Sequence, residues 1–231
     1  MTSYPIHLWR DCEPRSAAAH MALDETLFRI TEKKGIVIAR FYDWASPALT
    51  YGYFDQPPQQ SSIPAIRRFT GGGLVEHGED LTFLLTIPKA CKLSHQPSRD
   101  LYQTIHLAIA KALHSFGLEV TLENTETERQ NGPCFQTPVP QDVMDPNTNL
   151  KIGGGAQRRT RQGIIHQGSL RLPANYRKVE SEWIAEWLKQ LFGELVEYSE
   201  KDRQSAVSAA LDLEKSRYKT DEWNLSRQEV S

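Results

Sequence analysis

A run of three consecutive glycines, residues 71–73, constrains this chain more than any other stretch. The run follows Arg67 and Arg68 closely and precedes His77, and it lies between two segments with strand-like patterns. Because glycine has no β-carbon, the backbone can turn sharply here, and a ligand can lie against bare peptide amides. With cations beside it, such a turn suits an anion or a polar head group. A glycine-rich hairpin turn with two surface arginines is an equally good interpretation.

The glycine run lies among strands and does not open a helix. In residues 81–87, Leu81, Phe83, Leu85 and Ile87 alternate with less apolar positions, which predicts a strand with one strongly apolar face. A Walker-type phosphate loop leads into a helix and ends in Gly-Lys-Ser/Thr, and a Rossmann turn also opens a helix. Both phosphate-binding motifs are therefore excluded.

Helices are predicted on both sides of this region. Ser16 is expected to cap a helix that runs to about Lys34 and stops at Gly35. Asp24 and Glu25 in its middle are interpreted as solvated acids, with a functional role as the alternative.

The clearest helical stripe follows Ser98 or Asp100, either of which is a candidate cap, and ends at Gly117. His106 and His114 on this helix are interpreted as structural. Two more helices are expected after Lys178.

A second glycine triplet, residues 153–155, follows Lys151 and precedes Arg158 and Arg159. If the two triplets converge in space, they form a basic site lined by backbone. Such a site suits a carboxylate, a phosphate, or a carbonyl oxygen that becomes negative in a transition state. Two unrelated turns are the alternative interpretation.

The overall composition is that of a globular protein. A length of 231 residues favours a single domain, and the net charge of −2 argues against nucleic acid and anionic membranes as partners. Three cysteines without a Cys-x-x-Cys motif predict neither a disulfide framework nor a metal site, and they fit a reducing cytoplasm. The N-terminal residues do not show the basic segment and the apolar core that make up a signal peptide. No apolar run approaches the roughly 20 residues that a membrane span needs.

Cys134 is the candidate nucleophile, because it follows Gly-Pro in an irregular segment. A reactive cysteine needs a nearby cation to stabilise its thiolate, and Lys151 follows 17 residues later. A single cysteine is otherwise more often an inert, buried small hydrophobe.

These motifs resemble the lipoate–protein ligase and octanoyltransferase family, which shares its catalytic fold with the biotin–protein ligases. The resemblance covers most of the chain and rests on seven segments: residues 21–25 (MALDE), 40–44 (RFYDW), 52–56 (GYFDQ), 67–77 (RRFTGGGLVEH), 151–159 (KIGGGAQRR), 166–170 (HQGSL) and 218–224 (YKTDEWN). It implies an α+β fold of the class II biotin/lipoate ligase type, with a mixed, mostly antiparallel sheet flanked by helices. A single catalytic domain over residues 1–231, with its core at about 30–215 and no C-terminal accessory domain, is expected.

Two chemistries exist within that family. Ligases activate lipoate with ATP and Mg, whereas transferases carry an octanoyl group on a cysteine. In Bacillus-type transferases a cysteine in a Cys-Phe-x-x-Pro context precedes the motif lysine, and residues 134–138 (CFQTP) match that context here. The second transferase type has its cysteine after the lysine, and no cysteine follows Lys151. The resemblance therefore implies an octanoyltransferase of lipoate biosynthesis, with the ATP-dependent lipoate–protein ligase as the alternative.

The resemblance also implies partners and site residues. Octanoyl-acyl carrier protein would be the donor, lipoyl carrier domains (the glycine cleavage H protein or 2-oxoacid dehydrogenase E2 subunits) the acceptors, and no cofactor would be needed. Cys134 and Lys151 would be catalytic. Substrate binding would fall to the two glycine motifs and the strand that follows: Arg67, Arg68, Gly71, Gly72, Gly73, Leu74, His77, Gly153, Gly154, Gly155, Ala156, Gln157, His166 and Gly168.

Two positions depart from the family pattern, and other classes remain as alternatives. Leu74 stands where alanine is common, and Gly155 where serine is common. A biotin ligase is disfavoured because its Gly-Arg-Gly-Arg-like motif is missing. A non-catalytic protein that binds acyl or lipoyl groups is a third class.

Overall fold

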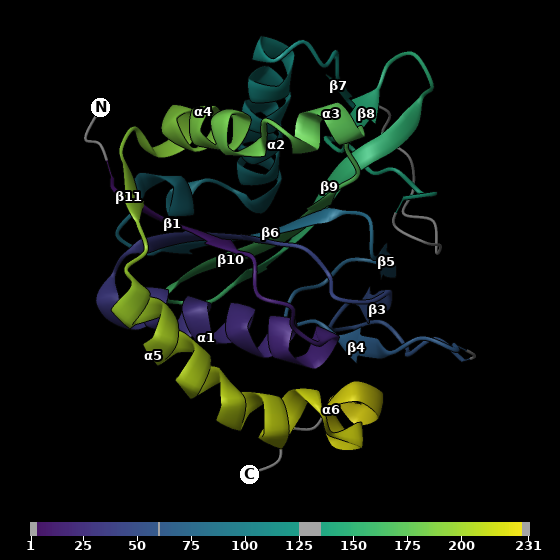
Figure 1. The fold of residues 1–231 in the computed structure, drawn as a ribbon, viewed down its shortest axis with the longest axis vertical. Coiled ribbons are helices and arrows are strands. Elements are labelled where there is room, and N and C mark those ends of the chain that lie inside the picture. Colours follow the sequence, from purple (N-terminus) through teal and green to yellow (C-terminus); the bar gives the residue numbers. More distant parts are fainter. Residues whose placement is uncertain (1–3, 60, 125–134, 228–231) are drawn as a thin grey trace.

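The computed structural model describes residues 4–59, 61–124 and 135–227 and has a mixed eight-stranded sheet at its centre (Figure 1). β1 runs parallel to both β2 and β11, and the other neighbouring pairs are antiparallel. The expected mixed, mostly antiparallel sheet is confirmed. In spatial order the strands are β11 (Leu195–Glu197), β1 (Ile6–Asp11), β2 (Val37–Tyr42), β6 (Leu81–Pro88), β10 (Gly163–Leu170), β9 (Leu150–Arg159), β8 (Val143–Asp145) and β7 (Thr121–Leu122).

Helices cover both faces of this sheet (Figure 1). α1 (Ala17–Lys34) and α5 (Glu200–Leu213) pack on one face, and α2 (Ser98–Ser115) and α4 (Glu180–Phe192) on the other. The shorter helical elements are η1 (Lys92–His95), α3 (Ala174–Arg177), the π-helix η2 (Glu214–Tyr218) and α6 (Asp221–Ser226). Two apolar cores result, one on each face of the sheet.

Helix α1 begins and ends where the sequence predicts. The Ser16 side chain accepts a hydrogen bond from the Ala19 amide, and Gly35 takes the left-handed conformation at φ 69°. The prediction that Asp24 and Glu25 are solvated is wrong, because both side chains are buried. The physical reason is that Asp24 faces the sheet, where it pairs with Arg40 of β2, and that Glu25 faces η2, where it accepts from Arg217 and Tyr218.

The predicted cap of α2 is also wrong. Ser98 is already the first helical residue, and Pro97 precedes it without a capping side-chain hydrogen bond. At the other end the prediction is confirmed to within a residue or two, because Gly117 at φ 87° follows the last turn.

Strand β6 differs from its predicted amphipathic pattern. All eight of its residues are buried, because it is a central strand with helices on both faces. Its threonines satisfy their hydroxyl groups locally: Thr86 pairs with Thr31, and Thr82 accepts from the indole of Trp44.

The two glycine triplets adopt different conformations. Residues 71–73 form a loop between β4 (Ala65–Arg67) and β5 (Val75–His77), which join β3 (Ala48–Tyr51) in a second, small sheet. Residues 153–155 instead lie inside β9, so the interpretation of this triplet as a turn is wrong. Neighbouring side chains occupy the space of the missing β-carbons: a β-carbon at Gly155 would lie 2.4 Å from Nε2 of His166.

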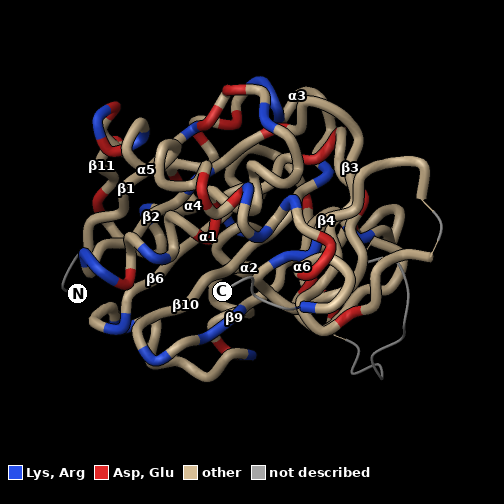
Figure 2. The backbone as a smooth tube through the Cα atoms, turned by 90° about the horizontal axis from the view of Figure 1, so that it is seen from below, with Lys and Arg blue, Asp and Glu red and all other residues tan. Residues whose placement is uncertain are grey.

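Charged residues are spread over the molecule. Figure 2 shows Lys and Arg interspersed with Asp and Glu along the backbone. None of the helices in the described part of the chain combines the length and the apolar character that a membrane crossing requires.

The packing around β10 gives a first test of this fold. A β-carbon at Gly168 would lie 2.1 Å from Cζ of the buried Phe83 ring. We expect Gly168→Ala to lower the free energy of unfolding by about 1–3 kcal/mol, as overpacking of a core does. Urea denaturation measures this change.

Gly71→Ala is the matched control for the same measurement. A β-carbon there meets no atom within 4 Å, and the backbone is not in the left-handed region. Equal loss of stability in the two variants would contradict the packing described for β6 and β10.

Candidate functional site

A pocket lies where the two glycine triplets meet. The space between its walls amounts to about 470 Å³, part of which is open solvent. Segments far apart in the sequence line it: Met21, Tyr42, Thr50, Arg68, Gly72, Gly73, Val75, His77, Thr82, Phe135, Gly154, Gly155, Ala156, Gln167, Gly168 and Ser169.

The structure brings most of the residues predicted from sequence to this pocket or directly behind it. Eight of them line it: Arg68, Gly72, Gly73, His77, Gly154, Gly155, Ala156 and Gly168. The lining does not include six others: Arg67, Gly71, Leu74, Gly153, Gln157 and His166. Lys151 lies behind Gly154, and Cys134 is outside the described residues.

Arg67 has a structural position in place of the predicted contact with a substrate. Its buried guanidinium donates to backbone carbonyls of two distant segments, including those of Tyr53 at 2.8 Å, Asp55 at 2.7 Å and Trp223 at 3.0 Å. The side chain of Asn224 accepts from the Arg67 amide at 2.9 Å. Arg67 therefore fastens α6 to the loop after β3.

Arg68 shapes the glycine loop from inside. Its guanidinium donates to the carbonyls of Gly71 at 2.9 Å and Gly73 at 2.8 Å, and to Oγ1 of Thr50 at 2.8 Å. With its carbonyls held in this way, the loop presents Gly72 and Gly73 to the pocket.

A hydrogen-bonded chain continues from Thr50 to His77 and Asp80. His77 contacts Oγ1 of Thr50 at 2.7 Å through Nε2 and Oδ2 of Asp80 at 2.8 Å through Nδ1, and its ring stacks on Trp44. Burial lowers the pKa of His77, and the neighbouring Asp80 carboxylate opposes that shift. Burial opposes the charge of Asp80, but its donors, among them His77 and Ser169, outweigh that effect and hold the pKa of Asp80 below its ordinary value.

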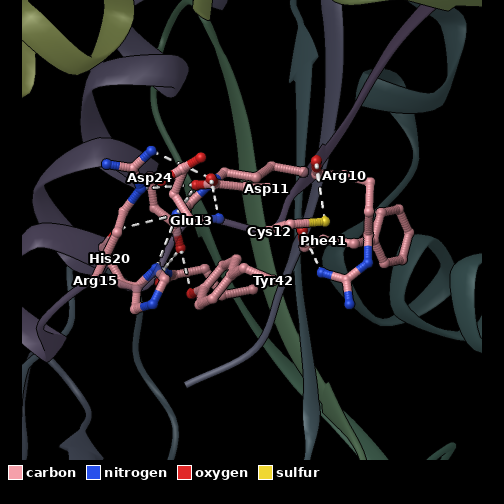
Figure 3. A network of polar contacts seen from close by, with 11 residues as sticks. Arg10, Asp11, Cys12, Glu13, Arg15, His20, Asp24, Phe41 and Tyr42 are labelled. Atoms are coloured by element: carbon pink, nitrogen blue, oxygen red, sulfur yellow. Dashed lines mark hydrogen bonds and ion pairs between the residues drawn. The ribbon is translucent and has the colours of Figure 1, made fainter. Parts of the chain in front are cut away.

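A cluster of buried charges stands behind another wall of the pocket (Figure 3). The guanidinium of Arg40 pairs with Asp11 at 2.6 Å and with Asp24 at 2.6 Å, and it donates to Nδ1 of His20 at 2.8 Å. Tyr42, which lines the pocket, donates its hydroxyl to Asp24 at 3.0 Å. The charges are paired and hydrogen-bonded, as full burial requires.

This cluster is connected to the first glycine motif. Nε2 of Gln167 donates to Asp24 at 2.7 Å, and Oε1 of Gln167 accepts from the Thr70 hydroxyl at 2.8 Å. The loop that begins at Gly71 is thereby held to a buried carboxylate on α1. Sequence reasoning missed this role of Asp24 and Gln167. A charged Arg40 inside an otherwise apolar strand was the available signal, since a buried cation needs an acidic partner.

Lys151 in β9 is nearly inaccessible and forms an ion pair with Asp142, with Nζ 2.7 Å from Oδ2. The ring centroid of Phe135, which lines the pocket, lies 5.8 Å from the same Nζ. Sequence reasoning missed Asp142, which no motif spacing singled out.

The fold is that of lipoate–protein ligase catalytic domains. A solved structure of lipoate-protein ligase A bound with ATP superposes with a TM-score of 0.75, at 20% identity, over 96% of this chain and 99% of that chain. A family model described as the lipoyl protein ligase A/B catalytic domain matches residues 16–212. The chain belongs to that family.

Curated relatives are similar to this chain at the level of sequence. Octanoyltransferase LipM of Oceanobacillus iheyensis is 30% identical over 172 residues, which cover 70% of this chain and 62% of that protein's length. Octanoyltransferase LipM of Anoxybacillus flavithermus is 25% identical over 276 aligned positions, which cover 95% of this chain and 99% of that protein.

The burial of His20 predicts that the free energy of unfolding depends on pH. Burial, and next to it the charge of Arg40, lowers the pKa of His20 from 6.5 to about 2. Between these two pH values, His20 is therefore protonated in the unfolded chain and neutral in the folded protein. The stabilisation that the neutral imidazole contributes is complete above pH 6.5 and is lost as the pH falls toward 2.

We expect His20→Asn, which retains an acceptor for Arg40, to flatten this dependence. The slope of the unfolding free energy against pH should decrease by about 1.4 kcal/mol per unit in that window. Urea denaturation at several pH values between neutrality and mild acid measures it, and an unchanged slope would contradict the assignment of a neutral buried His20.

Proposed function

We propose that this protein transfers an octanoyl group from acyl carrier protein, through a thioester on Cys134, to a lysine of a lipoyl carrier domain. The observation that carries the proposal is the position of Phe135. This residue follows Cys134 in the sequence, lines the pocket, and lies beside the ammonium group of Lys151. Phe135, the sequence neighbour of the predicted nucleophile, thus lines the same pocket as residues of both glycine motifs.

The proposed reaction has two acyl transfers. In the first, the Cys134 thiolate attacks the carbonyl carbon of the octanoyl thioester, and the carrier's thiolate leaves. In the second, the amine of the acceptor lysine attacks the new thioester, loses a proton, and releases the Cys134 thiolate. No nucleotide or metal is consumed, so the proposal requires no cofactor.

The described residues suit the charges that arise in these steps. Each tetrahedral intermediate places a negative charge on the carbonyl oxygen. The amide of Gly155 already donates to the Tyr102 hydroxyl at 2.9 Å, so we assign the oxyanion to amides of the loop at residues 71–73. The ammonium of Lys151 would favour the thiolate form of the nucleophile.

The lining of the pocket suits an acyl chain. Its exposed surface is mostly apolar, and it includes Met21, Val75 and the Phe135 ring. The polar side chains toward His77 are hydrogen-bonded to one another, as in the contact between Thr50 and His77. An apolar chain can lie against them without leaving a polar group unpaired.

A thioester on intact protein is the direct test of this function. After incubation with octanoyl-acyl carrier protein, mass spectrometry should find one octanoyl adduct on the wild type and none on Cys134→Ala. Transfer to a lipoyl domain should fall by on the order of 10⁴–10⁶-fold, the usual loss when a nucleophile is removed. Cys12→Ala is the matched control, because Cys12 is exposed and is not among the residues that line the pocket.

The same variants separate the alternative function. An ATP-dependent lipoate–protein ligase would carry no adduct and would attach lipoate at full rate after Cys134→Ala. That result would replace the transferase with a ligase. A protein that binds octanoate or lipoate but modifies no carrier domain would be a binding protein.

A further inference from the structure

The buried carboxylate of Asp142 lies directly behind the pocket, and no sequence motif pointed to it. We propose that Asp142, supported by Tyr102, is a positioning residue that holds the Lys151 ammonium at one place beside the reacting groups. The inference rests on the proposed function, since Lys151 is the group through which Asp142 would act.

The contacts of Asp142 leave it little freedom. One carboxylate oxygen, Oδ2, lies 2.7 Å from Nζ of Lys151 and accepts from the Val139 amide at 2.7 Å. The other oxygen, Oδ1, accepts from the Tyr102 hydroxyl at 2.6 Å. The Asp142 side chain is fully buried, and that of Lys151 is 2% exposed. Short, charge-assisted hydrogen bonds on both oxygens fix the direction of the carboxylate and so the position of its cation.

Tyr102 connects this ion pair to the strand that lines the pocket. Its hydroxyl donates to Asp142 and accepts from the Gly155 amide at 2.9 Å. Helix α2 therefore supplies a link between the carboxylate before β8 and the glycine motif in β9. Because Gly155 lines the pocket, the ammonium is fixed relative to the pocket wall.

Gly154 brings the ion pair close to the pocket. A β-carbon there would lie 2.6 Å from Nζ of Lys151 and 2.9 Å from Oδ1 of Asp142. Glycine at this position therefore leaves the space that the ion pair occupies, and Gly154 itself lines the pocket.

Two histidines near this ion pair, in the part of the chain that the structure describes, do not supply a charge in place of Asp142. Burial lowers the pKa of His106 to about 4, and it lowers that of His166 well below 6.5. Both imidazoles are therefore neutral near pH 7, and Nδ1 of His106 lies 2.7 Å from the Gln141 carbonyl. The neighbouring Tyr102 is hydrogen-bonded as a neutral hydroxyl.

A carboxylate so close to the ammonium also weakens its positive field. If field strength alone decided the rate, removing Asp142 would speed the reaction. Acyl transfer instead depends on placing a charge within a fraction of an ångström of the reacting atoms. The position of the Lys151 ammonium should therefore affect the rate more than the strength of its field does, and Asp142→Asn should slow the transfer.

A double-mutant cycle tests this inference. The variants are Asp142→Asn, Lys151→Met and the double variant, assayed with octanoyl-acyl carrier protein and a lipoyl domain. We expect Asp142→Asn to lower kcat by about 10²-fold, as a misplaced group does, with KM within about twofold. In the Lys151→Met background, Asp142→Asn should cost nothing further, because residues that act as a unit are not additive.

The control is Asp145→Asn, a partly buried carboxylate at the end of strand β8 that makes no contact with Lys151 among the hydrogen bonds and ion pairs of the described residues, and it should leave both constants unchanged. Additive losses in the cycle, or a loss confined to KM, would overturn the inference and make Asp142 a structural brace. If Asp142→Asn does not fold, the cycle of Tyr102→Phe with Lys151→Met decides by the same criterion.

Failure of the proposed function is visible separately. A wild-type protein that gains no octanoyl adduct would contradict the proposed transferase function. The double-mutant cycle would then be measured with ATP-dependent attachment of lipoate as the assay. Full activity of Lys151→Met in both reactions would overturn the inference, because Asp142 would have no group to position.

Discussion

The pairing of Arg40 with Asp11 and Asp24 is the interaction on which the rest of the structure depends. Arg40 lies in the middle of β2, where every residue is buried. A guanidinium without partners there would cost several kcal/mol, so β1 and α1 must each bring a carboxylate to it. This requirement fixes α1 along its axis against the sheet. The same Asp24 binds Gln167 and, through it, Thr70 at the start of the glycine loop. The packing of the first helix thus sets one wall of the pocket.

Missing β-carbons have a second, less obvious function in this site. The sequence suggests that glycines make turns, and at Gly72, with φ 88°, that interpretation is sound. In β9 and β10 the glycines instead make room for neighbouring side chains. Phe83 fills the space beside Gly168, and His166 the space beside Gly155. The departure from serine at residue 155 is explained by His166, since a β-carbon there would meet the imidazole.

The sequence was sufficient for the features that depend on local pattern. Periodicity and capping predicted α1 from Ser16 to Gly35, and the two glycine motifs predicted where the pocket lies. Features that depend on burial were not predictable. The amphipathic pattern of β6 could not reveal that helices cover both faces of the strand, and Asp24 gave no sign of its partners on other elements. From the sequence, Arg67 was interpreted as a ligand for an anion. The sequence cannot show that the backbone carbonyls of Tyr53 and Asn224, which are far apart in the chain, both accept hydrogen bonds from its guanidinium.

Two hydrogen-bonded chains reach the pocket from different elements, and together they explain how the two glycine motifs are held in place. One runs from Asp24 on α1 through Gln167 to Thr70. The other runs from Asp142 through Tyr102 on α2 to Gly155. Helices α1 and α2 lie on opposite faces of the sheet, so each glycine motif is anchored to a different apolar core. A shift of one motif relative to the other would require one core to repack. Preorganisation of this kind would lower the reorganisation needed as charge develops in the proposed acyl transfer, and it would come from the two cores of the fold.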